Sequence, residues 1–272
     1  MKRKLIFLAA ALFMLAACNG TKNNDPWGQV DPDEGVAHST TSEGTVSSKA
    51  MNRTMYYSVW LPAGYDKTKS YPILYLLHGY EDGNQSARHD RCWLNKGNAA
   101  YLADSYQKKG GVPMVIIMPN GLDKFYVSDG YEKYFEEELI PEVEKKFNGN
   151  GKRAIAGLSM GGFGTFYHAI KYHEKFLYAY AMSPATNYTW GNPQIIMADL
   201  FAQQDKTVFP KFSIEVGTED RTVNNADSKA LYNKMEQAGI KCEYISRAGT
   251  HNWEFWQECL PKALDKVGQS FK

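Results

Sequence analysis

The pentapeptide Gly157-Leu158-Ser159-Met160-Gly161, a G-x-S-x-G motif, constrains the fold of this chain more than any other feature. It follows an apolar segment, 153–158, that predicts a short strand, and it leads into a helical pattern at 162–172. Strand, motif and helix together predict a nucleophile elbow, a sharp turn that exposes a serine hydroxyl at the edge of a sheet. Glycines are needed there because the serine has strained dihedral angles and its neighbours approach closely.

Strand-like segments alternate with helical patterns from about residue 46 to the C-terminus. Three strand-like segments are continuously apolar, as expected for strands buried on both faces, at 72–77, 112–118 and 176–182. Further strands are predicted at 55–61, 212–216 and 240–246, and helices at 131–147, 224–237 and from 253 onward. This alternation predicts an α/β fold with a mostly parallel central sheet and helices on both faces. The segment 185–209 fits either a cap over the site or a crossover helix.

Two polar residues follow late strands in the order expected for a catalytic triad. Asp220 comes just after the strand at 212–216, and His251 follows the strand at 240–246. Because the carboxyl ends of parallel strands share one edge of the sheet, both side chains can meet Ser159 there. The order serine, acid, histidine is that of the α/β-hydrolase fold. We therefore expect Ser159 to be the nucleophile, His251 the general base and Asp220 the residue that orients the imidazole.

Two other acidic residues compete for the third position of the triad. Glu219 is adjacent to Asp220 but is expected to point elsewhere, and Asp227 already lies in the next predicted helix. Asp220 is therefore the preferred assignment.

The oxyanion hole is assigned to two backbone N–H groups. One belongs to Met160, which directly follows the nucleophile, and the other to Tyr80, in the His78-Gly79-Tyr80 loop after an apolar strand. His78 itself is expected to brace this loop rather than to transfer protons.

The first 45 residues predict export and membrane attachment. Lys2, Arg3 and Lys4 precede a short apolar run that ends in Leu15-Ala16-Ala17-Cys18, which matches a bacterial lipobox. We predict a lipoprotein signal peptide at 1–17, lipidation of Cys18, a flexible tether at 18–45 and a folded domain at 46–272. The alternative is an ordinary signal peptide with a chance cysteine. The protein is expected in the bacterial cell envelope, periplasmic or at the cell surface, anchored by lipid.

Composition and motif spacing argue against other classes of site. The 31 basic and 30 acidic residues give a net charge of +1, which does not favour a nucleic-acid partner. Neither Cys-x-x-Cys nor His-Glu-x-x-His spacing occurs, so neither a metal site nor a cofactor is expected. Besides Cys18, the chain contains Cys92, Cys242 and Cys259, which allow at most one disulfide among them, and the pairing stays open.

Together these motifs resemble the esterase D branch of the α/β-hydrolases, which includes carbohydrate esterase family one. The resemblance covers about residues 46–272 and rests on His78-Gly79, Glu138-Leu139-Ile140-Pro141, Gly157 to Gly162, Gly217-Thr218-Glu219-Asp220 and His251-Asn252-Trp253. It implies the α/β-hydrolase fold and a serine esterase, with feruloyl and acetylxylan esterases among the members of the branch. The expected reaction is removal of feruloyl or acetyl groups from xylan-type polysaccharide or oligosaccharide through an acyl-enzyme on Ser159.

Aromatic residues near these motifs are candidates for the substrate wall, because aromatic rings pack against sugar and aryl groups. They are Tyr80, Trp93, Phe125, Tyr126, Tyr188, Trp190 and Trp253. Three alternative functions stay open: an acyltransferase or a thioester hydrolase on the same triad, and a non-catalytic glycan-binding lipoprotein. The intact triad argues against the last.

Overall fold

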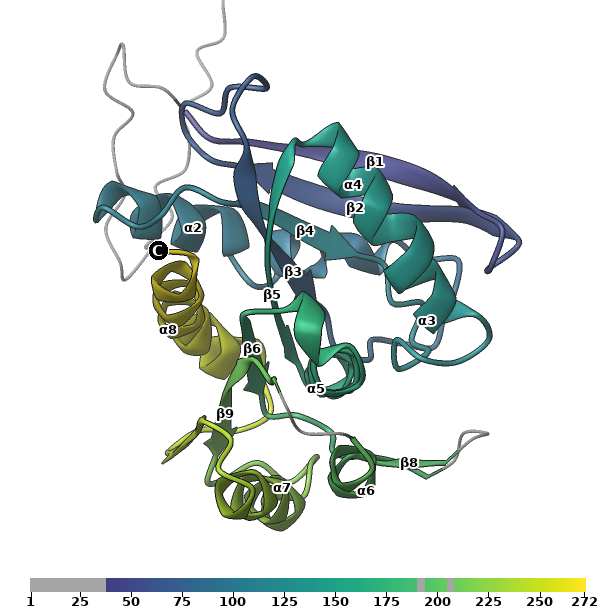
Figure 1. Cartoon of the computed structure of the whole chain (residues 1–272), viewed down its shortest axis with the longest axis vertical. Helices are drawn as coiled ribbons and strands as arrows, with labels where there is room; N and C mark the ends of the chain where they lie inside the picture. The colour runs from purple at the N-terminus through teal and green to yellow at the C-terminus, as the bar shows by residue number, and fades with distance from the viewer. Residues whose placement is uncertain (1–37, 190–193, 205–207) are drawn as a thin grey trace, which may run out of the picture. The chain divides into compact units, whose positions relative to one another are not determined.

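The computed structural model describes residues 38–189, 194–204 and 208–272, and they are built around one eight-stranded sheet (Figure 1). Its strand order is β1-β2-β4-β3-β5-β6-β9-β10. The strands are β1 (Thr40–Ser48), β2 (Arg53–Leu61), β3 (Tyr71–Leu77), β4 (Val115–Pro119), β5 (Gly149–Leu158), β6 (Tyr178–Met182), β9 (Lys211–Gly217) and β10 (Cys242–Arg247). The pairs β1–β2 and β2–β4 are antiparallel and the other five are parallel. The predicted, mostly parallel sheet is confirmed.

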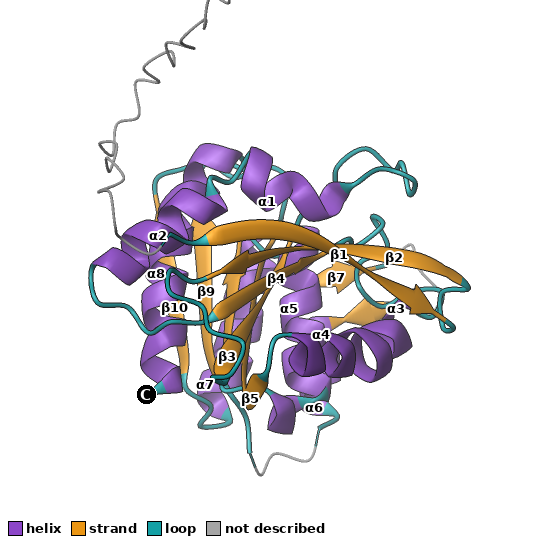
Figure 2. Ribbon diagram, turned by 90° about the horizontal axis from the view of Figure 1, so that it is seen from above, coloured by secondary structure: helices purple, strands orange, loops and turns teal. Residues whose placement is uncertain are grey.

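Helices cover both faces of this sheet (Figure 2). One face carries α1 (Cys92–Asn95), α2 (Ala99–Lys108) and α8 (Trp253–Phe271). The other carries α3 (Tyr131–Lys133), α4 (Ile140–Lys146), α5 (Met160–Lys171), α6 (Met197–Ala202) and α7 (Asn225–Gln237). Alternate residues of β3 enter the two cores: Ile73 and Tyr75 lie on the α5 side, and Leu74 and Leu76 on the α8 side. This two-sided burial explains why the segment is apolar throughout.

The helix predicted at 131–147 contains a π-helical turn. Residues Tyr134–Leu139 form this turn between α3 and α4. Pro141 lies in the first turn of α4, directly after it. A π-helical turn interrupts the regular hydrogen-bond pattern of a helix, and a proline lacks the N–H group that this pattern uses, so the two irregular features lie next to each other.

The folded domain begins earlier than the sequence predicts. β1 starts at Thr40, so residues 40–45 belong to the sheet and the tether assigned to 18–45 is wrong for them. Of the nine residues of β1, only Gly44, Val46 and Ser48 are buried. An edge strand with one face in water carries polar residues, and its composition therefore resembles that of a linker. The predicted signal peptide, Cys18 and the tether up to residue 37 lie outside the described residues.

The described part of the segment 185–209 packs into the core. It forms a small two-stranded sheet of β7 (Asn187–Tyr188) and β8 (Ile195–Ile196), followed by α6. Met197 and Phe201 of α6 are buried in the same core as α5. The burial of these two residues favours the crossover helix over a cap above the site.

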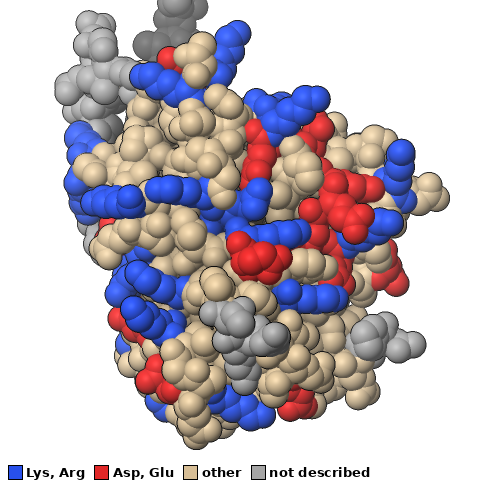
Figure 3. All heavy atoms as spheres, in the orientation of Figure 1, with Lys and Arg blue, Asp and Glu red and all other residues tan. Residues whose placement is uncertain are grey.

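Charges are mixed over the surface, in keeping with the balanced composition. Basic and acidic side chains are interspersed over the face shown in Figure 3. Over the described ranges, no helix is both long enough and apolar enough to cross a membrane.

The three cysteines in the described part of the chain are free thiols. Cys92 and Cys259 are buried and Cys242 is half-buried. Burial raises the pKa of the Cys242 thiol to about 12 and raises the pKa of the other two thiols as well. These cysteines are therefore protonated and poorly nucleophilic at neutral pH.

A buried carboxylate ties together the strands that precede the predicted acid and base. Glu215 of β9 accepts hydrogen bonds from Tyr180 of β6 (2.5 Å), Arg247 of β10 (2.5 Å) and Lys262 of α8 (2.6 Å). Burial raises the pKa of Glu215, but the hydrogen bonds from these three donors outweigh it and leave the pKa below its ordinary value of 4.5. The carboxylate is therefore ionised in the folded protein and anchors β6, β10 and α8 to β9.

We expect Glu215→Gln to lower the free energy of unfolding by about 2 kcal/mol at pH 7, because two cations lose their carboxylate. The folded-state pKa lies below the unfolded value, so the wild-type advantage is present above about pH 4.5 and shrinks as the pH falls below it. Urea denaturation of both proteins at about pH 7 and pH 3.5 measures the difference. A difference of equal size at both pH values would contradict the ionic contribution.

Candidate active site

The nucleophile elbow lies between β5 and α5. β5 ends at Leu158 and α5 begins at Met160, so Ser159 occupies the turn itself, with φ 52° and ψ −115°. Such a positive φ is uncommon for a residue other than glycine and is typical of strained functional turns. A Cβ atom on Gly161 would lie 2.4 Å from the carbonyl oxygen of Leu77, so only glycine fits there. The predicted elbow is confirmed.

The structure brings the three predicted triad residues together at the carboxyl ends of β5, β9 and β10. Nε2 of His251 lies 2.9 Å from Oγ of Ser159, and Nδ1 of His251 lies 2.7 Å from Oδ2 of Asp220. The Asp220 side chain is fully buried, whereas 12% of the His251 side chain is exposed. With Nδ1–H donating to the carboxylate, Nε2 is left to accept the serine proton.

Asp220 is held in its ionised form. Its second oxygen, Oδ1, accepts hydrogen bonds from the backbone N–H groups of Thr222 (2.9 Å) and Val223 (3.2 Å). Burial raises the pKa of Asp220, but the hydrogen bonds from His251 and from these N–H groups outweigh it, and the pKa lies below its ordinary value of 3.8. A carboxylate in this state fixes the imidazole tautomer and stabilises an imidazolium.

Neither competing carboxylate takes the place of Asp220. Glu219 points away from the triad: its Oε2 accepts a hydrogen bond from the N–H of Gly249 at 2.7 Å, and its own N–H donates to the Gly249 carbonyl at 3.0 Å. Asp227 lies on α7 and accepts a hydrogen bond from Asn187 at 3.0 Å. Glu219 therefore clamps the loop that leads to His251.

We expect Glu219→Ala to lower kcat by about 10-fold, because the loop that positions His251 loses its clamp and small misplacements of a catalytic group are costly. Glu219→Gln should recover most of this loss, since the amide oxygen can still accept the Gly249 N–H. Steady-state kinetics on an aryl ester, with the pH profile of each variant, measures the effect. Wild-type kcat in Glu219→Ala, or no recovery in Glu219→Gln, would argue against this positioning role.

Of the two predicted oxyanion donors, one directly follows the nucleophile at the start of α5 and the other lies in the loop after β3. Met160 is the first residue of α5, where helix N–H groups have no partner within the helix. Gly79 packs directly against the elbow, because a Cβ atom on it would lie 2.5 Å from Cδ1 of Leu158 and 3.4 Å from Cβ of Ser159. Tyr80, the next residue, borders the same pocket as Ser159. The assignment of these N–H groups as donors to an oxyanion stays a prediction.

His78 braces this loop, as the sequence predicts. Its Nδ1 lies 2.6 Å from the carbonyl oxygen of Gly79, and its Nε2 accepts the N–H of Gly121 at 2.7 Å. The carbonyl of His78 accepts the hydroxyl of Tyr126 at 3.0 Å. Burial lowers the pKa of His78, which favours the neutral imidazole that can donate from one nitrogen and accept at the other.

A cavity of about 390 Å³ opens at Ser159 and His251. Tyr80, Trp253 and Trp256 contribute aromatic side chains to its lining. Sequence reasoning identified the first two and missed Trp256, which packs edge-to-face on the His251 ring at a centroid distance of 4.9 Å. Its position, three residues after Trp253 on the same helix, is a signal that helical spacing offers. Two acidic residues, Glu81 and Glu254, also line the cavity and were not predicted.

Three aromatic residues proposed for the substrate wall, Trp93, Phe125 and Tyr126, are buried instead. Trp93 is 1% exposed and donates its Nε1–H to the carbonyl of Leu77 at 3.0 Å, and Tyr126 is fully buried. Phe125 and Tyr188 stack on each other at 4.7 Å, and neither contributes to the described lining of the cavity. An aromatic side chain near a catalytic motif can either contact the substrate or pack against the loops of the site. The sequence alone does not distinguish these two roles. Trp190 lies outside the described residues.

Comparisons with known proteins agree with this architecture. A family model described as "Putative esterase" matches residues 48–267. The chain is 29% identical over 250 residues to an endo-1,4-beta-xylanase/feruloyl esterase of Xylanibacter ruminicola, which covers 85% of this chain and 32% of that protein. It is 28% identical over 230 residues to an acetyl esterase of Caldicellulosiruptor saccharolyticus, covering 71% of this chain and 81% of that protein.

A solved structure of a ferulic acid esterase is similar to this fold. The two share 27% sequence identity with a TM-score of 0.75, over 87% of this chain and 100% of that one. The chain spans about a third of the length of the Xylanibacter relative, so the similarity concerns one part of that larger protein. The family match, by contrast, runs from the last residue of β1 into α8 and so includes the other seven strands of the sheet. The chain therefore belongs to this Esterase family and is a serine esterase with the α/β-hydrolase fold.

Proposed function

We propose that this esterase removes feruloyl or acetyl groups from xylan-type plant polysaccharide through an acyl-enzyme on Ser159. One observation carries the catalytic part of the proposal: the hydrogen-bonded chain from Asp220 through His251 to Ser159, which ends in an open cavity. The substrate class is supported by the relatives of this chain, a feruloyl esterase and an acetyl esterase among them.

The geometry supports a two-step ester hydrolysis. Nε2 of His251 accepts the proton of Ser159 as Oγ attacks the ester carbonyl, and the imidazolium then protonates the departing sugar oxygen, which leaves as a hydroxyl. The attack turns the carbonyl oxygen into a negatively charged oxygen, which the N–H groups of Met160 and Tyr80 would stabilise. Collapse of this intermediate breaks the ester C–O bond and leaves the acyl group on Ser159. Water, activated by the same imidazole, then attacks the acyl-enzyme and releases the free acid. Asp220 stays ionised throughout and stabilises the imidazolium.

The lining of the cavity favours the feruloyl group over the acetyl group. Tyr80 and Trp253, which line the cavity and are not buried, offer ring surfaces against which an aryl acid packs, whereas an acetyl group is too small to use them. Tyr80 is 56% exposed, so its ring is accessible to substrate.

Rates on methyl ferulate and on an acetylated xylo-oligosaccharide test the substrate class. We expect methyl ferulate to have the higher kcat/KM. Tyr80→Ala should raise KM for methyl ferulate several-fold and leave KM for the acetylated sugar nearly unchanged, because the backbone N–H is retained and only the ring is lost. Faster turnover of the acetylated sugar, together with no effect of Tyr80→Ala, would identify an acetyl esterase instead.

Product analysis distinguishes hydrolysis from acyl transfer. With methyl ferulate and an added acceptor alcohol, a hydrolase releases mainly ferulic acid, whereas an acyltransferase forms mainly the new ester. A thioester substrate in the same assay tests the thioester-hydrolase alternative.

We further propose that residues 1–17 are a lipoprotein signal peptide and that Cys18 carries the lipid, which would place the esterase in the cell envelope. The charged segment, apolar run and lipobox support this. In a bacterial host, labelled palmitate should be incorporated into the wild-type chain and not into Cys18→Ala. Equal incorporation into both proteins would contradict the assignment.

A further inference from the structure

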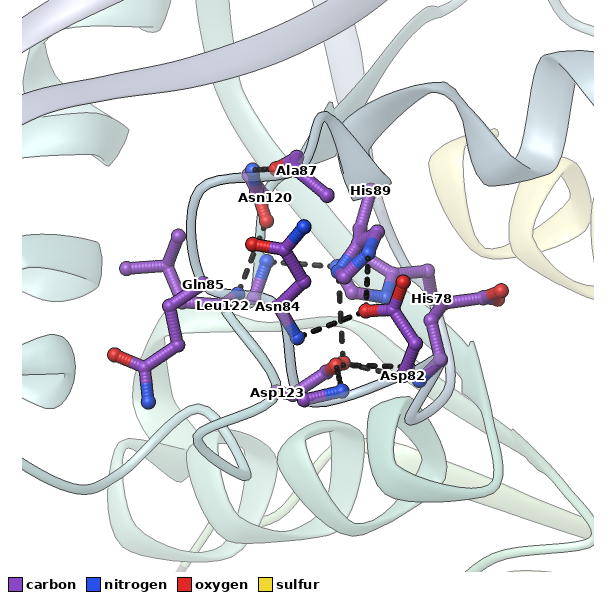
Figure 4. Close-up of polar contacts among 12 residues, drawn as sticks. His78, Asp82, Asn84, Gln85, Ala87, His89, Asn120, Leu122 and Asp123 are labelled. Carbon is purple, nitrogen blue, oxygen red and sulfur yellow. Dashed lines mark hydrogen bonds and ion pairs between the residues drawn. The ribbon is translucent and has the colours of Figure 1, made fainter.

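We propose that Asp82, His89 and Asp123 form a binding site for a divalent cation of the Zn²⁺ type, beside the loop that carries Tyr80 (Figure 4). Each residue offers one ligand atom, and these atoms all lie within 4.8 Å of one another. Two carboxylates and one imidazole suit Zn²⁺ and its neighbours in the first transition row, whereas Ca²⁺ and Mg²⁺ prefer oxygen ligands alone. The three residues come from two loops, which is why the local spacing of the sequence did not indicate a site.

The imidazole lies between the two carboxylates. Nε2 of His89 is 3.3 Å from Oδ1 of Asp82, and Nδ1 is 3.6 Å from Oδ1 of Asp123. His89 is only 6% exposed, and its buried Nδ1 has no hydrogen-bond partner among the described residues. Leaving a buried polar nitrogen unsatisfied is unfavourable. A bound cation would relieve this cost, because Nδ1 would bind the cation while the N–H on Nε2 points toward a carboxylate.

The negative charges of Asp82 and Asp123 also favour a bound cation. The Asp123 side chain is 2% exposed, and within the described part of the chain the only ion-pair partner of Asp82 and of Asp123 is His89. A neutral imidazole would leave two negative charges together, one of them buried, which is unfavourable without a cation. A divalent cation balances both carboxylates.

The carboxylates are already oriented by surrounding backbone groups. Asp123 accepts hydrogen bonds from three successive N–H groups, those of Glu81 (3.1 Å), Asp82 (3.2 Å) and Gly83 (2.8 Å). Asp82 accepts the N–H of Asn84 at 2.8 Å. The two oxygens that face His89, Oδ1 of Asp123 and Oδ1 of Asp82, each accept only one of these N–H groups and retain a lone pair for a metal. Such outer hydrogen bonds hold ligands in place.

The distances need only a small adjustment to admit an ion. Ligands at about 2.1 Å from Zn²⁺ in a tetrahedral site are separated by about 3.4 Å. Only one nitrogen of an imidazole binds a given ion, and the separation of Nδ1 of His89 from Oδ1 of Asp123, 3.6 Å, is close to that value. The Asp82 side chain is 61% exposed and is therefore free to swing inward and close the remaining separation. Water would complete the coordination.

The cation site lies next to the loop that carries Tyr80. The His89 ring packs edge-to-face on the His78 ring at 5.6 Å, and the N–H groups that hold Asp123 belong to the residues right after Tyr80. A bound cation would thus rigidify the loop that presents the proposed oxyanion donor. This expected effect on catalysis rests on the proposed function, whereas cation binding does not.

Isothermal titration of the metal-depleted, untagged full chain with ZnCl₂ tests the site. We expect one ion per chain and a rise in the thermal midpoint on binding. Asp82→Asn should weaken the affinity at least about 10-fold, as the loss of one charged ligand does. Asp82 is the residue to change because it is exposed, so the variant should fold normally. Asp129→Asn, a similarly exposed acid ion-paired with Lys124, is the matched control and should bind like the wild type.

Absence of Zn²⁺ binding, or equal affinity in wild type and Asp82→Asn, would overturn the site. Hydrolysis of an aryl ester is measured on the same samples. The metal-depleted protein should retain hydrolysis and gain a few-fold in kcat with Zn²⁺, and this gain should be absent in Asp82→Asn. Binding lost in Asp82→Asn without any esterase activity would uphold the cation site and refute the proposed function, so the two proposals fail separately.

Discussion

Replacing Ser159 with alanine is expected to lower kcat/KM for an aryl ester by about 10⁴- to 10⁶-fold, the range seen when a triad nucleophile is removed. The hydroxyl oxygen is the only atom that can form the acyl-enzyme, and without it His251 has no proton to accept from this position. Residual activity should come from substrate binding and oxyanion stabilisation alone. Steady-state kinetics on purified protein measures the loss, and circular dichroism checks that the fold persists.

Ser183→Ala is the matched control. Ser183 also follows a parallel strand, β6, and also has a positive φ, 42°, but its buried Oγ has no hydrogen-bond partner in the described chain. The same substitution there should change kcat/KM by less than a few-fold. If Ser159→Ala hydrolyses aryl esters as fast as Ser183→Ala, Ser159 is not the nucleophile.

Asp220→Asn should lower kcat by about 10²- to 10⁴-fold while leaving KM nearly unchanged. The amide keeps the shape of the side chain but removes the charge that stabilises the imidazolium, and it favours the wrong imidazole tautomer. The ionised state of Asp220 makes this change large, since its hydrogen bonds keep its pKa low despite burial. Kinetics across the neutral pH range measures the effect.

Asp227→Asn provides the comparison, because Asp227 is one of the two competing acids and accepts its hydrogen bond from Asn187 on the crossover segment. It should retain activity within a few-fold of wild type. The opposite pattern, an active Asp220→Asn and an inactive Asp227→Asn, would transfer the role to Asp227.

The catalytic centre is where sequence and structure agree most closely. Ser159 was predictable because a nucleophile elbow is a local structure, encoded by glycines within a few residues of the serine. Asp220 and His251 were predictable because parallel strands place their carboxyl ends at one edge, so position after a strand is enough to bring distant residues together.

The substrate wall shows where local pattern stops being informative. Trp93 and Trp253 were both candidates for the substrate wall. In the structure, Trp93 is buried against the end of β3, where it donates to the carbonyl of Leu77, whereas Trp253 lines the cavity. Burial is decided by which elements pack above a side chain, and that depends on contacts between segments far apart in the chain. The same holds for Trp256, whose role depends on the position of the His251 ring.

By itself, the sequence determined the α/β architecture, the elbow and the order of the triad, because these follow from periodicity and from short motifs. Only the tertiary structure decided that polar residues 40–45 form an edge strand, since the pairing with β2 is not visible in their composition. It also decided that Asp82 and His89 meet Asp123 from a separate loop. The physical reason is the same in both cases: hydrogen-bond partners and ligand neighbours are set by long-range packing, whereas motifs record only what is adjacent along the chain.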